Sequence, residues 1–178
     1  MRLPTVLYAA AAALGLAEPA AAGYRDTTKP IGVVVNLDLE RYLGRWYEIA
    51  RFPNWFERNC AGVTADYALK PDGKIEVVNT CRKGAPDGPV ETAVGEASLV
   101  GPGKLEVTFV PWLPFAKGDY WVLHIDAAYS YAVVGEPSGK TGWILARSPA
   151  LDPAKYDKAV SALQSMGYDT SRLERVDH

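Results

Sequence analysis

The chain has 178 residues, of which 48% are hydrophobic and 11% aromatic, and its formal net charge is −2. This length fits one domain with one core, and the composition excludes a disordered chain. The small net charge gives no electrostatic reason to bind nucleic acid.

The first 22 residues predict a secretory signal peptide. Arg2 provides a positive start, an apolar run covers residues 3–17, and Ala20-Ala21-Ala22 offers a cleavage site of small residues. The run is shorter than the roughly 20 residues that a membrane-spanning helix needs. No cysteine precedes Cys60, which argues against a lipid anchor on an N-terminal cysteine. We therefore expect an exported, soluble protein of the periplasm or the medium.

The rest of the chain predicts one all-β domain at 36–176, after a loose lead-in at 23–35. Turn residues such as Pro71-Asp72-Gly73 separate short strand-like runs. We expect the strands at 44–52, 61–69, 74–82, 90–100, 104–110, 119–126, 131–135 and 142–147.

The spacing of apolar residues changes near the end of the chain. We expect a helix that begins after Asp152 as the N-cap, with Pro153 at its first position, and that ends before Gly167. A last short strand is expected at 172–176. The pattern favours an eight-stranded up-and-down antiparallel β-barrel with one C-terminal α-helix packed outside, and an eight-stranded sandwich is the alternative.

The only two cysteines, Cys60 and Cys81, are expected to form a disulfide because an exported chain passes through an oxidising compartment. Two free thiols are the alternative, and two cysteines without a nearby histidine make a metal site improbable. A hairpin centred near residue 71.5 places Cys81 opposite residue 62, so a bulge is needed to bring Cys60 within reach.

Two motifs resemble those of a known family. The string from Gly44 through Trp46 to Arg51 resembles the Gly-x-Trp motif of lipocalins, and its longer form is similar to bacterial lipocalins and apolipoprotein D. The string from Trp143 to Arg147 resembles the last-strand motif of the same families. The segment 126–131 resembles, in a degenerate form, the third conserved segment of lipocalins. The resemblance implies that Gly44, Trp46 and Arg147 are structural. In that family the indole closes one end of the barrel beneath the guanidinium, a cation–π contact.

The resemblance also implies a cavity for a small hydrophobic ligand. Alternate residues of a strand share a face, so inward positions can be assigned by parity. The candidate ligand-binding residues are Tyr67, Val77, Asn79, Phe109, Trp121, Leu123, Trp143 and Leu145. This apolar set with a few polar groups suits an alkyl chain with one polar end. We expect a fatty acid or a lysophospholipid, bound for transport, storage or cell-envelope lipid maintenance; a retinoid or tetrapyrrole is the alternative.

Catalysis is not expected, because the only histidines are His124, predicted to face outward, and the C-terminal His178. Carboxylate chemistry at Glu48 or Asp66 stays open, although nothing in the sequence pairs them. We expect no cofactor and no metal. A protein-interaction module is a third class.

The loop at 111–115 is unusually apolar for an exposed segment. Trp112 and Phe115 could form an entrance lip, a homodimer contact or a transient membrane contact. Four basic residues could meet an acidic head group near the mouth, or could be ordinary solvated charges: Arg51, Arg58, Lys83 and Lys117.

Overall fold

The computed structural model describes residues 23–113 and 115–178, so the predicted signal peptide lies outside the described residues. The strands are β1 (Gly44–Arg51), β2 (Cys60–Leu69), β3 (Ile75–Lys83), β4 (Val90–Gly101), β5 (Lys104–Thr108), β6 (Gly118–Ile125), β7 (Tyr131–Gly135), β8 (Gly142–Ala146) and β9 (Glu174–Arg175). The helices are α1 (Leu39–Tyr42), α2 (Pro153–Ser165) and the short 3₁₀ helix η1 (Thr170–Arg172).

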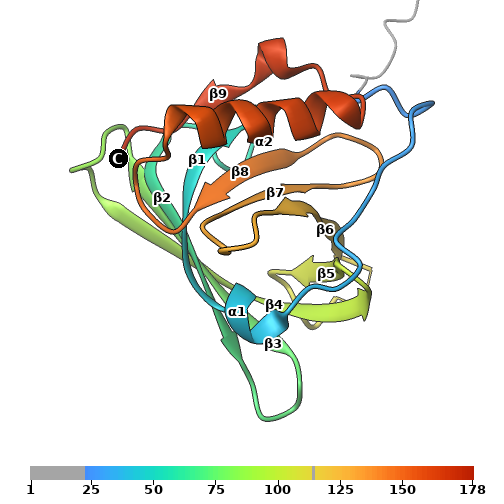
Figure 1. Cartoon of the computed structure of the whole chain (residues 1–178). Coiled ribbons are helices and arrows are strands. Elements are labelled where there is room, and N and C mark those ends of the chain that lie inside the picture. Colours follow the sequence, from blue (N-terminus) through green and yellow to red (C-terminus); the bar gives the residue numbers. More distant parts are fainter. Residues whose placement is uncertain (1–22, 114) are drawn as a thin grey trace, which may run out of the picture.

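The strands form one closed antiparallel barrel (Figure 1). Each strand from β2 to β7 pairs with the next, β8 pairs with β1, and β1 pairs with β2, which closes the ring of eight. The ninth strand, β9, pairs with the far end of β1. The predicted eight-stranded barrel is confirmed, and the expected last strand is shorter than 172–176.

The β2–β3 hairpin carries the disulfide. Its pairing slips between Ala61 and Thr64, where Gly62 adopts a left-handed φ of 53°. The slip brings Cys60 opposite the end of β3 with its Cα 5.3 Å from that of Cys81, and the two sulfurs are bonded. The predicted disulfide is confirmed, together with the irregularity that it required.

Apolar side chains gather in two clusters, because both faces of part of the barrel are covered. The inner cluster fills the end of the barrel near α1 and includes Trp46, Tyr67, Val77, Leu105 and Leu145. The outer cluster lies between the barrel and α2, which Figure 1 shows lying along the outside. It includes Leu123, Ile144, Ala159, Leu163 and Tyr168.

Helix α2 begins and ends where the sequence predicts. The Asp152 side chain accepts hydrogen bonds from the backbone N–H groups of Ala154 and Lys155, which caps the helix. Gly167 follows the C-terminal end with a φ of 91°, a conformation that favours glycine.

The expectation that 23–35 is a loose lead-in was wrong. Arg25 is buried, and its guanidinium donates to the backbone carbonyls of Met166 and Pro137, each at 2.8 Å, and of Lys29. These bonds fasten the segment to the loops after α2 and β7. A buried cation bound only by carbonyl oxygens has no pattern in the sequence that would reveal it.

Candidate functional site

A cavity of about 700 Å³ lies inside the barrel. Strands β1 to β6 and β8 contribute to its wall, and the loops β1–β2 and β5–β6 contribute at the mouth. This volume falls within the range typical of small-molecule sites. Most of the lining surface is apolar.

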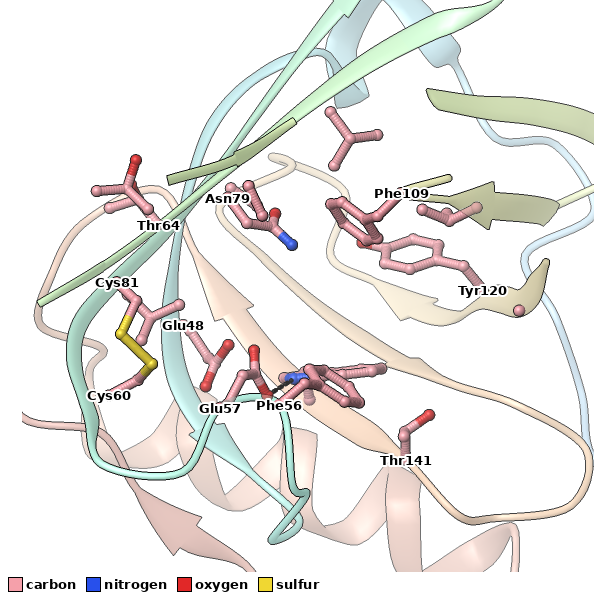
Figure 2. Close-up of a pocket in the computed structure, with 18 of the residues that line it drawn as sticks. Glu48, Phe56, Glu57, Cys60, Thr64, Asn79, Cys81, Phe109, Tyr120 and Thr141 are labelled. Carbon is pink, nitrogen blue, oxygen red and sulfur yellow. Dashed lines mark hydrogen bonds between the residues drawn. A yellow bond between two sulfur atoms is a disulfide. The ribbon is translucent and has the colours of Figure 1, made fainter. Parts of the chain in front are cut away.

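Six of the eight predicted ligand-binding residues line this cavity. They lie on β2, β3, β8 and directly after β5, and are Tyr67, Val77, Asn79, Phe109, Trp143 and Leu145. Asn79 and Phe109 lie on the cavity wall in Figure 2. The structure therefore places these six side chains on the inner face, as parity predicts. Their contact with a ligand stays a prediction.

The assignment of Trp121 and Leu123 to the cavity was wrong. Leu123 is buried in the outer cluster beneath α2, and Trp121 packs against that cluster. Their neighbours Tyr120 and Val122 face inward instead. Strand β6 is apolar on both faces because the cavity lies on one side and α2 on the other, so hydrophobic alternation cannot distinguish them.

The closed end of the barrel matches its prediction. The Arg147 guanidinium carbon lies 3.8 Å from the centre of the Trp46 ring, a cation–π contact. Arg147 also donates to the carbonyl oxygens of Arg41 at 2.6 Å and Leu43 at 2.9 Å, at the end of α1, and of Arg45 at 2.7 Å. Trp46 is fully buried, which supports the structural interpretation of the motif.

Gly44 fits the same structural role. Its φ of 88° lies in the left-handed region, and a Cβ atom there would lie 3.6 Å from the Arg147 guanidinium. Any other residue at this position would be strained by its backbone conformation.

Three tyrosines form a buried hydroxyl cluster at the base of the cavity. The Tyr120 hydroxyl lies 2.7 Å from that of Tyr42 and 2.9 Å from that of Tyr67. Burial raises the pKa of all three phenols, so they stay neutral at physiological pH. Tyr67 and Tyr120 also line the cavity and offer polar atoms in its lower part.

Two of the carboxylates that line the cavity, Glu48 and Glu57, lie beside each other, and only Glu48 was named from the sequence. Glu48, on β1, is buried and forms an ion pair with Arg51 at 2.8 Å. Glu57, from the loop β1–β2, accepts a hydrogen bond from the indole N–H of Trp143 at 3.0 Å and another from Asn54. Figure 2 shows the two carboxyl groups close to each other. Burial raises the pKa of Glu48 well above its ordinary value, and the adjacent Glu57 carboxylate raises it further.

Sequence reasoning missed this pair because Glu57 lies in an irregular loop, where parity gives no direction. Glu48 and Asp66, the two carboxylates considered from the sequence, are not paired with each other: Glu48 lies beside Glu57, and Asp66 forms an ion pair with Arg45 at 2.9 Å. The basic residue three positions after Glu48, Arg51, is the signal that could have indicated the partner of Glu48.

The four basic residues considered for an acidic head group are placed as follows. Arg51 is bound to Glu48 and donates to the Cys60 carbonyl at 3.0 Å. Lys83 lines the cavity but pairs with Glu91 at 3.1 Å, and Lys117 pairs with Glu106 at 3.2 Å. Arg58 is exposed and is not part of the cavity lining.

Exposed aromatic residues lie on two loops that contribute to the cavity lining at the mouth. Trp55 is 80% exposed, Trp112 74% and Phe115 81%. They belong to the loops β1–β2 and β5–β6, which both contribute to the cavity lining through Phe56, Phe109 and other residues. We call the three residues Trp55, Trp112 and Phe115 the lip.

Within residues 23–113 and 115–178, no group of three or more His, Cys, Asp or Glu residues is placed to hold a metal ion. No helix in the same part is long and apolar enough to cross a bilayer.

Comparison with known proteins identifies the family. Residues 37–178 match the model of the lipocalin-like domain. Temperature-induced lipocalin-1 of Arabidopsis thaliana is 40% identical over 83% of this chain and 83% of its own. Outer membrane lipoprotein Blc of Escherichia coli K12 is 38% identical over 96% of this chain and 94% of its own. Mouse apolipoprotein D is 37% identical over 80% and 77% of the two chains.

The fold agrees with solved structures as well. Insecticyanin from the tobacco hornworm Manduca sexta superimposes with a TM-score of 0.66 at 23% identity, over 88% of this chain and 87% of that one. The chain therefore belongs to the lipocalin family, whose members bind small hydrophobic ligands.

Proposed function

We propose that this lipocalin is an exported carrier of a single-chain lipid, a fatty acid or a lysophospholipid, held inside the barrel for lipid transport, storage or envelope maintenance. The cavity of about 700 Å³ is the observation that carries this proposal. Its apolar wall suits an alkyl chain, and a closed base formed by Trp46 and the tyrosine cluster leaves the mouth as the entrance.

The polar lining supports a ligand with one polar end. Most of the lining surface is apolar, and the polar groups that face the cavity include the carboxyl groups of Glu48 and Glu57, the Asn79 amide and the hydroxyls of Tyr67 and Tyr120. A molecule with polar groups along its whole length would leave many of them without partners, which costs free energy. In this proposal the protein is a carrier and not an enzyme.

Direct binding measurements test the proposal. Lysophosphatidylcholine and dodecanoate, titrated below their micelle concentrations, are expected to bind at one molecule per barrel and to change tryptophan fluorescence. The change should be absent in Trp143→Phe, because Trp143 lines the cavity, and kept in Trp112→Phe, which replaces an exposed lip residue. Failure of every single-chain lipid to bind below about 100 μM, an affinity of roughly −5.5 kcal/mol, would overturn it.

We also propose that the lip makes transient contact with a membrane from which the ligand is taken. Exposed aromatic side chains at the mouth of a cavity for lipids place an apolar surface where a lipid must enter. Trp112→Ser with Phe115→Ser should weaken binding to phosphatidylcholine vesicles in a flotation assay. The control is Val94→Ser with Val100→Ser, because both valines are also more than half exposed but lie on β4. Equal loss in both variants, or a dimer that only the lip variant disrupts, would contradict membrane contact.

A further inference from the structure

The charges around the cavity are unequal. Four carboxylate residues contribute to its lining, Glu48, Glu57, Glu91 and Asp119, and in the described part of the chain Lys83 is the one basic residue that does so. Lys83 is already paired with Glu91. The neighbouring cation Arg51 is held by Glu48 and by a backbone carbonyl.

Glu48 and Glu57 place two carboxyl groups beside one cation, Arg51. Arg51 pairs with Glu48, and Glu57 accepts from two neutral donors, the Trp143 indole N–H and the Asn54 amide. Burial and Glu57 raise the pKa of Glu48, so the two carboxyl groups hold a proton more readily than an isolated carboxyl group does. Glu48 is about nineteen-twentieths buried, and the surroundings are apolar, so charges here are weakly screened. A ligand carboxylate at this place would meet two carboxyl groups and, in the described part of the chain, no unpaired cation of the cavity lining.

Aromatic rings flank the same place. Trp143 lines the cavity with its indole nitrogen fixed by Glu57, and Phe56 precedes Glu57 and also lines the cavity (Figure 2). Aromatic faces beside carboxylates are the surroundings in which ammonium groups are bound, by cation–π attraction and by ion pairing.

We propose that Glu48 and Glu57, with Trp143 and Phe56, form a head-group site that selects single-chain lipids ending in an ammonium group over those ending in a free carboxylate. This inference rests on the proposed lipid-carrier function and narrows its ligand class. An ammonium head group placed between the two carboxyl groups takes the place of the proton that they otherwise hold, which is released to water. An alkyl carboxylate cannot take that place, which removes fatty acids from the preferred ligands.

Chain-matched probes test this selection. Dodecyltrimethylammonium, dodecanoate and neutral dodecanol are titrated by calorimetry below their micelle concentrations. The wild type is expected to bind the ammonium probe about tenfold or more tightly than the carboxylate probe, with the alcohol in between. Lysophosphatidylcholine and lysophosphatidylglycerol of equal chain length then show whether a phosphate in the head group changes the preference.

Two charge-neutralising variants separate a local site from general attraction. Glu57→Gln keeps an oxygen that can accept from Trp143 and removes one negative charge from the pair. Asp119→Asn removes one charge from an exposed residue of the same lining. The preference should fall by about tenfold in Glu57→Gln and by less than about twofold in Asp119→Asn.

The outcomes are distinct. Equal or tighter binding of dodecanoate, or an unchanged preference in Glu57→Gln, overturns the head-group site and leaves the lipid carrier intact. An equal loss in both variants shows long-range attraction and also overturns the site. Binding of none of the probes overturns the proposed function itself, and the head-group site with it.

Discussion

Replacing Arg147 by Met tests how the barrel is closed. The substitution removes three short hydrogen bonds to the carbonyls of Arg41, Leu43 and Arg45, and the cation–π contact with Trp46. These carbonyls are partly exposed and regain water, so about 0.5 kcal/mol for each bond is appropriate, the lower end of the usual range. The cation–π contact adds about 1 kcal/mol.

The expected loss is therefore about 2.5 kcal/mol in the free energy of unfolding, or roughly 5–10 °C in Tm for a chain of this size. Urea unfolding followed by far-ultraviolet circular dichroism measures it. Arg45→Met is the matched control: it removes only an exposed pair with Asp66, worth under about 1 kcal/mol, and keeps the Arg45 backbone carbonyl that Arg147 uses. Arg147→Met within about 0.5 kcal/mol of the wild type would refute this account of the closed end.

Three other predictions concern stability. Replacing both Cys60 and Cys81 by Ala removes a cross-link between positions 21 residues apart, and should lower the free energy of unfolding in urea by about 3 kcal/mol. The reduced wild type should show a similar loss, and an unchanged stability on reduction would contradict this prediction. Because burial and Glu57 raise the pKa of Glu48, the native state binds more protons than the unfolded state, so this group's stabilising contribution falls as pH rises above about 4.5. The difference in unfolding free energy between wild type and Glu48→Gln should therefore shift against the wild type from pH 4 to pH 8, and a shift in its favour would show that the sign is wrong. Arg25→Met should release the segment 23–35 and speed its cleavage in limited proteolysis, whereas Lys29→Met, which keeps the backbone carbonyl that Arg25 binds, should not.

The barrel is predictable because strand length, turn residues and the two motifs all agree. Pro71-Asp72-Gly73 lies where β2 turns into β3, and Asp152-Pro153 starts α2. Each of these signals depends only on residues that are neighbours in the chain, so it can be recognised in a single sequence. Inward faces follow by parity wherever the outer face of a strand meets water, as in β5, where Leu105 is buried and Lys104 lies at the surface with its ammonium group over Trp121.

Parity fails where tertiary packing decides the environment of both faces. Trp121 and Leu123 are as apolar as inward residues because α2 covers them, and nothing in β6 itself reports the helix. The position of Glu57 beside Trp143 and the hydrogen bond from Arg25 to Met166 both depend on irregular backbone, which brings residues that are distant in the sequence together. The helix α1 was missed because it has only four residues, too few to show a period.

Native mass spectrometry of the chain from Gly23 onward, purified without detergent and then offered a single-chain lipid, tests the central claim most directly. We predict one lipid per barrel, with the bound mass lost in Val77→Trp, a large side chain placed on the cavity wall, and kept in Val94→Trp on the outer face of β4. A protein that binds no such lipid, or that binds it equally well with Trp at position 77, would contradict a carrier whose ligand lies inside the barrel.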